Sequence, residues 1–273
     1  MKKLFVLIIF IFALTSSYGQ RGFSLPFSSV YNEDAPILLG LQYNYVNQNY
    51  MLGLKKEWER QTIDYPGDNI NDLGELQAIK SKTGSGFAVS IPVDFRATDN
   101  LYFTFSPSFL FINHLGIEYT SMDQTKKPLL RKTRHIQTSS SGSNFNSFEF
   151  PFNIKFRSDE KILKNKFNRY RGYVTGGARY SRWIGINEEY NALLKESSDI
   201  AQSIILKPGY LSWEFGIGVD IFFPYFKMSP EIKFNQSFKS VLDHQHPLAA
   251  DNQFMNPLEK GLIRNIYLSI IFQ

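Results

Sequence analysis

LSWEFGIGVDIFFPYFKMSPEIKFNQSF, at residues 211–238, alternates apolar side chains with polar or small ones. The apolar residues run from Leu211 to Ile221 at every second position, and the alternation resumes at Phe226 after a tight turn at Pro224. Two runs of period two around a short turn predict an antiparallel β-hairpin. The other face mixes glycine and serine with charges of both signs, as the inside of a narrow barrel does. If the apolar face meets the solvent, that solvent is lipid, which predicts a membrane β-barrel.

The N-terminal segment has the parts of a secretory signal peptide. Two lysines precede an apolar run, Leu4–Leu14, that is too short to span a bilayer, and small residues follow it. We expect cleavage between Gly19 and Gln20 and export to the outer membrane. The predicted division is a signal peptide at 1–19, a periplasmic lead-in at 20–36 and an outer-membrane β-barrel at 37–273. Because the chain has no cysteine, neither a lipid anchor on cysteine nor a disulfide stabilises it.

Charge and composition exclude other classes of protein. Removing the signal peptide leaves 28 basic against 25 acidic residues, a balance that argues against a nucleic-acid partner. The mature chain has no apolar run long enough for a transmembrane helix, whereas barrel strands are only about 10 residues long. An aromatic share of 16%, with 25 Phe and 15 Tyr, suits a lipid-facing surface with aromatic girdles.

Eight segments of period two predict an all-β fold, an eight-stranded antiparallel transmembrane β-barrel with long extracellular loops and short periplasmic turns. The expected strands are 37–46, 85–96, 101–113, 145–157, 170–184, 209–223, 225–238 and 262–273, with the first paired to the last. Their connections alternate long and short, as expected for an even-stranded barrel with both termini in the periplasm. A soluble eight-stranded barrel is the alternative, but its interior would be apolar.

The long connections are expected to be polar outer loops. Residues 47–84 and 114–143 are read as two large loops, with a turn marked at Tyr65–Asn69 in the first. Residues 187–201 can form a short helix capped by Asn187. The charged connection Ser158–Arg169 lies on the periplasmic side.

Four prolines interrupt the predicted strands, where each removes a donor from the ladder. They are Pro92, Pro107, Pro151 and Pro230. Each lies at a similar distance from the periplasmic end of its strand, which favours a belt of β-bulges. The alternative is that some strands are broken there.

Charged residues on the inward faces predict a structural network inside the barrel. Its expected members are Asp94, Arg96, Glu149, Lys155, Arg157, Arg179, Glu214, Asp220, Lys227, Glu231 and Lys233. An eight-stranded barrel has room only for side chains, so these charges are expected to pair and to fill the lumen. An ion or proton path is the functional alternative.

No motif for catalysis, for a cofactor or for metal is recognised. A nucleophile elbow, a zinc-protease motif and a phosphate-binding glycine loop are all missing from the sequence. The histidines fall in or beside predicted outer loops, at His114, His135, His244 and His246. His244 and His246 could hold a metal, and the basic cluster 126–134 could meet anionic lipopolysaccharide, but solvated loops explain both.

The amino-acid sequences of the predicted strands also resemble those of a known family. GIGVDIFFPYFKMSPEIKFNQSFKSVL, residues 216–242, closely resembles the penultimate hairpin of the PorT family, a barrel component of the type IX secretion and gliding-motility apparatus of Bacteroidota. Further matches are DAPILLGLQYNYV, SFEFPFNIKFRS, RYRGYVTGGARYSRW and the dipeptide Lys207-Pro208. The resemblance covers nearly the whole mature chain and is looser in the outer loops.

The resemblance implies a non-enzymatic outer-membrane protein required for type IX secretion, which positions partner proteins. Its expected partners are outer-membrane lipid and other secretion-system proteins. Two alternatives stay open: a small barrel adhesin or surface-stability protein, and an outer-membrane enzyme that modifies lipids. No catalytic set was found at the predicted barrel rim for the last of these.

Overall fold

The structure is a computed structural model that describes residues 23–25, 32, 34–64, 72–132, 145–162, 169–195, 204–250 and 252–273. The predicted signal peptide and the turn at 65–69 lie outside the described residues, as does most of the predicted lead-in. In the described ranges, no helix is long and apolar enough to cross a membrane.

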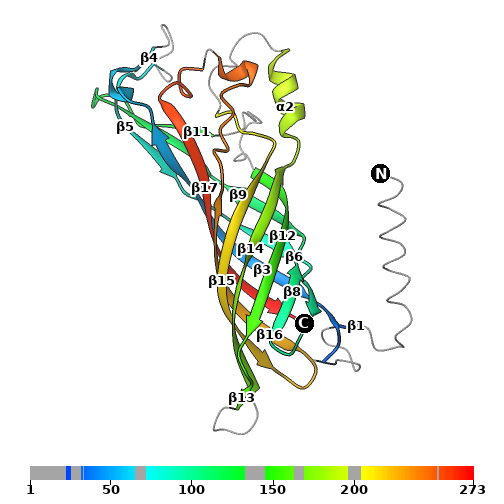
Figure 1. The fold of residues 1–273 in the computed structure, drawn as a ribbon. Helices are drawn as coiled ribbons and strands as arrows, with labels where there is room; N and C mark the ends of the chain where they lie inside the picture. The colour runs from blue at the N-terminus through cyan, green and yellow to red at the C-terminus, as the bar shows by residue number, and fades with distance from the viewer. Residues whose placement is uncertain are drawn as a thin grey trace.

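Within these ranges, eight antiparallel strands close into one barrel (Figure 1). Three of the eight are interrupted and carry two labels. The strands are β2–β3 (Ile37–Leu39, Leu41–Leu54), β6–β7 (Gly84–Ser90, Val93–Arg96), β8–β9 (Leu101–Phe105, Ser108–Asn113), β12 (Phe145–Arg157), β14 (Arg169–Trp183), β15 (Gly209–Phe222), β16 (Lys227–Ser237) and β17 (Leu258–Phe272). The last strand pairs with the first, from Phe272 opposite Leu41 to Leu258 opposite Leu54. The predicted architecture and its closure are confirmed.

The barrel wall is apolar outside and polar inside. On β15 the outward residues Leu211, Phe215 and Ile217 are 56%, 51% and 54% exposed, whereas the inward Glu214 and Asp220 are 2% and 0% exposed. A water-soluble domain does not expose a continuous apolar band and bury its charges. The molecule is therefore a transmembrane barrel whose outer wall faces lipid.

The predicted β-bulges at the prolines are wrong. Ser90 lies opposite Ser108 and Val93 opposite Phe105, so the register is the same on both sides of Pro92. The hydrogen-bond ladder is interrupted without any shift in register, and β6 and β8 end before Pro92 and Pro107. Pro151 and Pro230 lie inside continuous strands, also in constant register. Broken strands therefore account for two prolines and bulges for none.

The two ends of the barrel differ. At one end, the C-terminus and β1 (Phe23–Ser24) lie near the short turns 97–100 and 223–226 (Figure 1). This end is called the terminal end below. The hairpin of β13 (Lys161–Ile162) with β14 also extends from this end. The long connections lie at the opposite end. The predicted phase of long and short connections is confirmed.

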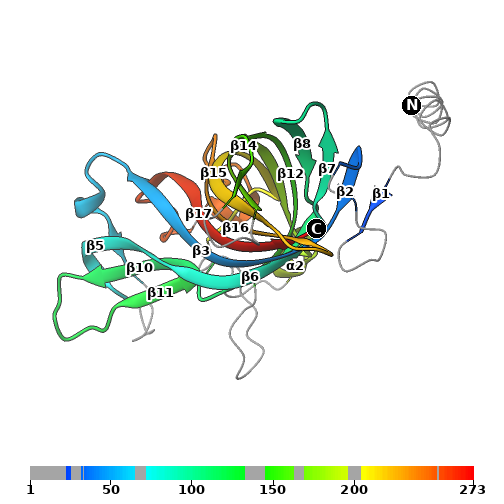
Figure 2. The same ribbon diagram turned by 90° about the horizontal axis from the view of Figure 1, so that it is seen from below.

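The described parts of the predicted large loops 47–84 and 114–143 contain regular structure, which corrects the prediction: residues 47–54 continue the barrel strand β3, and most of the other described residues belong to ordered elements. The described elements between the barrel strands at the end opposite the termini form a cap. Its elements are η1 (Trp58–Arg60), β4 (Thr62–Ile63), β5 (Gly74–Lys82), β10 (Gly116–Ser121), β11 (Leu129–Lys132), α2 (Ile186–Leu193) and η3 (Pro247–Ala249). Strands β4, β5, β10 and β11 make a second sheet, and β5, β10 and β11 project beyond the ring of barrel strands (Figure 2).

The cap has an apolar core of its own. Its fully or nearly buried side chains include Ile63, Leu73, Leu76, Ile117, Tyr119, Tyr190, Leu248 and Phe254. The same cluster contains inward residues from the tops of the barrel strands, among them Leu110, Ile112 and Ile263. The cap is thus built like a water-soluble domain and continues into the barrel mouth. The predicted helix is present but begins at Ile186, so Asn187 lies within it instead of capping it.

Candidate functional site: a filled lumen beneath the cap

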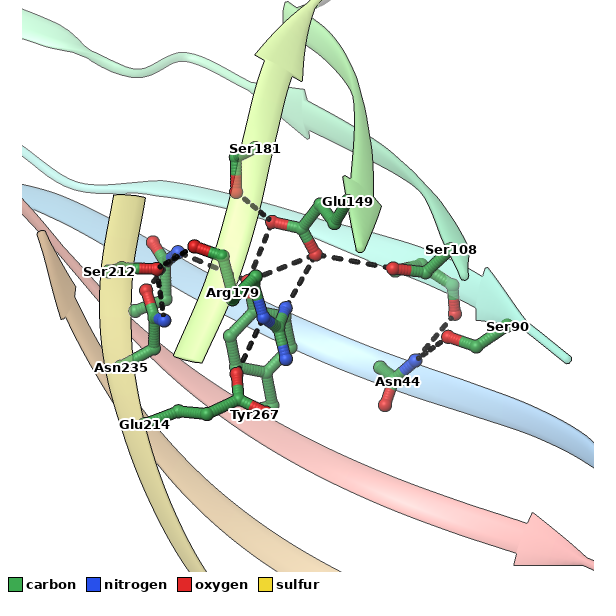
Figure 3. Close-up of polar contacts among 12 residues, drawn as sticks. Asn44, Ser90, Ser108, Glu149, Arg179, Ser181, Ser212, Glu214, Asn235 and Tyr267 are labelled. Atoms are coloured by element: carbon green, nitrogen blue, oxygen red, sulfur yellow. Dashed lines mark hydrogen bonds and ion pairs between the residues drawn. The ribbon is translucent and has the colours of Figure 1, made fainter. Parts of the chain in front are cut away.

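An arginine between two glutamates occupies the centre of the lumen. Arg179 on β14 donates from Nη1 to Oε2 of Glu149 and from Nε to Oε2 of Glu214, both at 2.6 Å. The Tyr267 hydroxyl donates to Oε1 of Glu149 at 2.9 Å, and its ring centroid lies 4.1 Å from the Arg179 guanidinium carbon. These side chains turn toward one another inside the barrel (Figure 3). Short charge-assisted bonds therefore satisfy both carboxylates.

Lysine and amide groups extend this central cluster. Asn153 donates from Nδ2 to Oε1 of Glu214 at 2.6 Å. Lys233 Nζ lies 3.6 Å from the same oxygen and 2.9 Å from Oε1 of Glu231. Glu214 thus receives contacts from three strands, β12, β14 and β16, which ties neighbouring parts of the wall together.

A second cluster lies nearer the terminal end. Lys155 Nζ is 2.8 Å from Oδ2 of Asp94, and Arg157 Nε is 2.8 Å from Oδ2 of Asp220. An Arg157 Nη2 to Asp94 Oδ2 distance of 3.6 Å links the two pairs, and Lys227 Nζ lies 3.9 Å from Oδ1 of Asp220. All five side chains are at most 3% exposed. They form a closed group with one more base than acid.

The lumen charges balance once both clusters are taken together. Five acids, Asp94, Glu149, Glu214, Asp220 and Glu231, are buried with five bases, Lys155, Arg157, Arg179, Lys227 and Lys233. Burying charges costs less free energy when each charge has opposite neighbours and hydrogen bonds. Each of the ten has an opposite charge within 4.0 Å, so the arrangement is that of a structural network of ion pairs, although Lys227 Nζ makes no hydrogen bond among the described residues.

Side chains leave almost no space in the centre of the barrel. The cavity beside Arg179 has a volume of about 10 Å³, roughly enough for one water. Its lining is Gln42, Asn44, Ser90, Ser106, Ser108, Pro151, Arg179, Lys233 and Tyr267. Above this polar layer, most inward residues are apolar and belong to the core shared with the cap, although the buried Gln48 of β3 lies among them. The expectation of a polar interior is therefore right for the centre and terminal end, and wrong for the mouth.

Arg96 does not belong to the lumen network, which corrects its predicted place there. Its side chain is 19% exposed and pairs with Asp34 at 2.7 Å and with Asp99 at 2.6 Å. Asp99 lies in the short turn after β7, so the strand has already left the barrel interior at this position. Inward parity alone could not show where along the strand the lumen ends.

Several lumen residues were missed by a prediction that considered only formal charges. Tyr267 and Asn153 bond to the central carboxylates. Tyr102 and Tyr173 lie under cations, with Arg157 at 3.8 Å from the Tyr102 centroid and Lys155 at 4.8 Å from that of Tyr173. All have inward parity, so the signal that could have found them is an uncharged polar or tyrosine side chain on a charged face.

One of the cap histidines, His246, has a local structural role. His246 Nδ1 accepts from the Leu248 amide at 3.2 Å and so caps η3. Burial, together with the nearby Lys55, lowers the pKa of His244, which favours its neutral form. Among the described residues, no group of three or more His, Cys, Asp or Glu is placed to hold a metal. His135 lies outside these residues.

The predicted basic cluster is only partly described. Lys126 Nζ pairs with Asp72 at 3.2 Å, and the Arg131 guanidinium lies 4.2 Å from the centroid of Phe254. Arg134 lies outside the described residues. At least two of the cluster's cations are thus occupied within the cap.

Comparisons with known proteins show likeness only at the level of structure. No family model matches the sequence, and no curated protein matches it. The attachment invasion locus protein Ail of Yersinia pestis is similar at 9% identity and a TM-score of 0.30, over 86% of this chain and 96% of that one. Neisserial surface protein A is 8% identical with a TM-score of 0.35, over 85% and 95% of the two chains.

The outer membrane protein OprG from Pseudomonas aeruginosa is a third similar structure. It is 7% identical with a TM-score of 0.35, and the alignment covers 85% of this chain and 94% of that one. Identities and TM-scores this low say nothing about shared ligands or function.

Proposed function

We propose that this protein is a non-enzymatic outer-membrane barrel that holds or positions other proteins. The observation that supports this most is the filled lumen, whose central cavity of about 10 Å³ is too small for a solute path. In the described part of the chain, the surfaces left for binding other proteins include the cap at one end and the hairpin β13–β14 at the other.

The first specific function we propose is a role in type IX protein secretion, in keeping with the resemblance of residues 216–242 to the PorT family. In such a role the terminal end faces the periplasm, and the connection 158–169 meets periplasmic partners. Its described part carries exposed Lys161 and Ile162, the latter 71% exposed. An exposed apolar side chain beside a charged one is typical of surfaces that contact other proteins.

Deletion of the gene tests this function. The expected result is that cargo bearing type IX signals accumulates in the periplasm and disappears from the medium. Complementation by the full chain should restore secretion, whereas a neutral Gly/Ser graft over 159–166 should restore the folded barrel but not secretion. Normal secretion in the deletion strain would rule out this role.

The second function we propose, as an alternative, is that of a surface adhesin or surface-stability protein. The observation in its favour is the cap, which has a packed core and a projecting sheet where a pure membrane anchor would have loose loops. A chain whose cap is replaced by short turns would then keep secretion intact but lose attachment of cells to host or matrix surfaces. Intact attachment with the shortened cap would exclude this alternative.

A further inference from the structure

The barrel seam leaves one strand edge uncovered by β17 at the terminal end. Strand β17 pairs with β3 only as far as Leu41, and the first barrel strand continues beyond this point as β2. Because the Gly40 amide donates to the Pro92 carbonyl at 2.9 Å, the backbone of Gly40 faces the strand β6–β7. Neighbouring residues of a strand face opposite edges, so the backbone groups of Ile37 and Leu39 face the seam. This edge of β2 therefore needs a partner that β17 does not supply.

Strand β1 of the lead-in occupies this edge. It lies alongside β2 in parallel, with Phe23 opposite Ile37 and Ser24 opposite Leu38 (Figure 2). The contact comprises two residue pairs, whereas β3 and β17 share fourteen. Parallel pairs are also slightly less stable than antiparallel ones. In the described part of the chain β1 pairs with β2 alone, so a short and weakly held strand covers the edge.

The side chains at this end of the seam suit an extended segment with apolar residues. At the end of β17, the ring centroid of Phe226 lies 6.2 Å from that of Phe272, and Phe223 stacks on Phe226 at 4.7 Å. Leu41, which lies opposite Phe272, is 56% exposed. A segment that runs along β2 below the end of β17 would have these side chains beside its outward face, where apolar residues are favoured.

We propose that the seam edge of β2 is a docking site for an extended segment of a periplasmic partner protein, and that β1 occupies it until the partner binds. This inference rests on the proposed role in positioning other proteins. The partner segment pairs its backbone with Ile37 and Leu39, and its apolar side chains contact the aromatic rings at the end of β17. Strand addition at a sheet edge takes its affinity from backbone hydrogen bonds and its specificity from alternate side chains. A partner that runs antiparallel to β2 forms the more stable kind of ladder, which favours its exchange for β1.

Engineered disulfides in this cysteine-free chain test whether β1 has to leave the edge. Phe23→Cys with Ile37→Cys joins β1 to β2, and Ile37→Cys with Phe95→Cys joins β2 to β7. Both pairs lie directly opposite on neighbouring strands, about 5 Å apart, which is within the range of about 4.4–6.8 Å between the Cα atoms of a disulfide. The two locks share one cysteine. The β2–β7 lock is therefore the matched control, because it leaves the seam edge open to exchange.

The first measurement is secretion by a deletion strain complemented with each lock. We expect the β1–β2 lock to block release of type IX cargo and a reductant to restore it, whereas the β2–β7 lock secretes like the unmodified chain in both conditions. Equal secretion by the two locks, in a background where the deletion strain secretes no cargo, would overturn the docking site and leave the proposed function standing. Normal secretion by the deletion strain would refute the type IX role instead, and the docking site is then decided by binding alone.

The second measurement is binding of an extended probe to the full mature chain in detergent micelles. The probe is a fluorescent synthetic peptide that copies residues 20–31. Phe23→Pro with Ser24→Pro removes the N–H groups of β1, and this variant should bind the peptide about tenfold more tightly than the unmodified chain, because a tethered β1 competes at high effective concentration. A peptide with the same two prolines is the control and should not bind. The oxidised β1–β2 lock should exclude the probe, whereas the β2–β7 lock should bind it as the unmodified chain does. Absence of binding to the proline variant, or equal binding to the two locks, would overturn the docking site.

Discussion

Arg179 shows how a single side chain can hold the barrel interior together. Its guanidinium bonds to Glu149 and Glu214 at 2.6 Å each, and the three side chains are at most 5% exposed. In a medium of low polarity, the attraction within such a triad offsets the cost of removing three charges from water only while every partner is present. Removing the arginine leaves two carboxylates facing each other without their shared cation.

We expect Arg179→Met to lower the free energy of unfolding by about 3–5 kcal/mol, the usual cost of breaking a buried ion pair. Urea titration of the protein in detergent micelles, followed by tryptophan fluorescence, measures the midpoint. Arg60→Met is the control, because Arg60 is 79% exposed and its pair with Glu57 is solvated. Adding Glu149→Gln and Glu214→Gln to Arg179→Met should restore most of the loss. A midpoint that does not move in the single variant would show that the triad is not stabilising.

At the level of secondary structure, the prolines in the barrel strands change the backbone hydrogen bonding between neighbouring strands. The Ile91 amide donates to the Pro107 carbonyl at 3.1 Å, and the Ser106 amide donates to the Pro151 carbonyl at 3.3 Å. In an antiparallel pair the second residue normally returns a bond, but proline has no N–H. The prolines therefore keep the strands in register while they remove half of each bonded pair.

We expect Pro107→Val to stabilise the barrel by roughly 1 kcal/mol. The new amide can donate to the Ile91 carbonyl, and relieving a carbonyl without a donor is worth about 1–3 kcal/mol. Loss of the proline restriction on the unfolded chain subtracts about 0.4–1 kcal/mol. The urea midpoint measures the net change, with Pro224→Val in the exposed turn as the control. A lower midpoint for Pro107→Val would mean that the backbone at this position cannot accept an ordinary strand residue.

The barrel strands were predictable because their period of two is enforced by lipid on one side and charge on the other. The cap strands were not, and β5 shows why. Leu76 and Ile79 are both buried although they differ in parity, because a register shift between Thr120 and Ser121 on β10 moves the pairing by one residue. A bulge of this kind removes the alternation on which the strand prediction depends.

The candidate site, like the fold, could be predicted only in part from the sequence. Alternation assigned the lumen charges to the inner wall, but it could not locate the level at which the interior becomes apolar. Leu110 and Ile263 have the same inward parity as the buried charges, yet they belong to the core shared with the cap. The prediction for Arg96 was wrong for the corresponding reason at the terminal end of the barrel, because parity does not show where the lumen ends. Position along the barrel axis depends on strand tilt, which one strand's sequence does not record.

The whole molecule combines two ways of burying residues. The barrel exposes its apolar side chains to lipid and encloses its charges, whereas the cap encloses its apolar side chains and exposes its charges, as soluble domains do. The two meet at the barrel mouth, where inward residues such as Ile112 pack with the cap. A path through the molecule would have to cross this apolar layer and then both charge clusters.

We expect the protein to show no steady single-channel conductance when it is reconstituted in planar lipid bilayers. The central cavity of about 10 Å³ is no larger than one water, and the side chains that surround it are bonded to one another. Replacing Glu149, Arg179 and Glu214 together by serine removes two acids and one base, which shifts the lumen charge by only one unit, and removes the crossing side chains, so this variant tests whether the cluster is the barrier. If the apolar mouth also closes the path, the serine variant stays silent until the cap is shortened as well. Steady conductance of the unmodified chain would contradict a filled lumen and with it the premise that this barrel works by binding proteins.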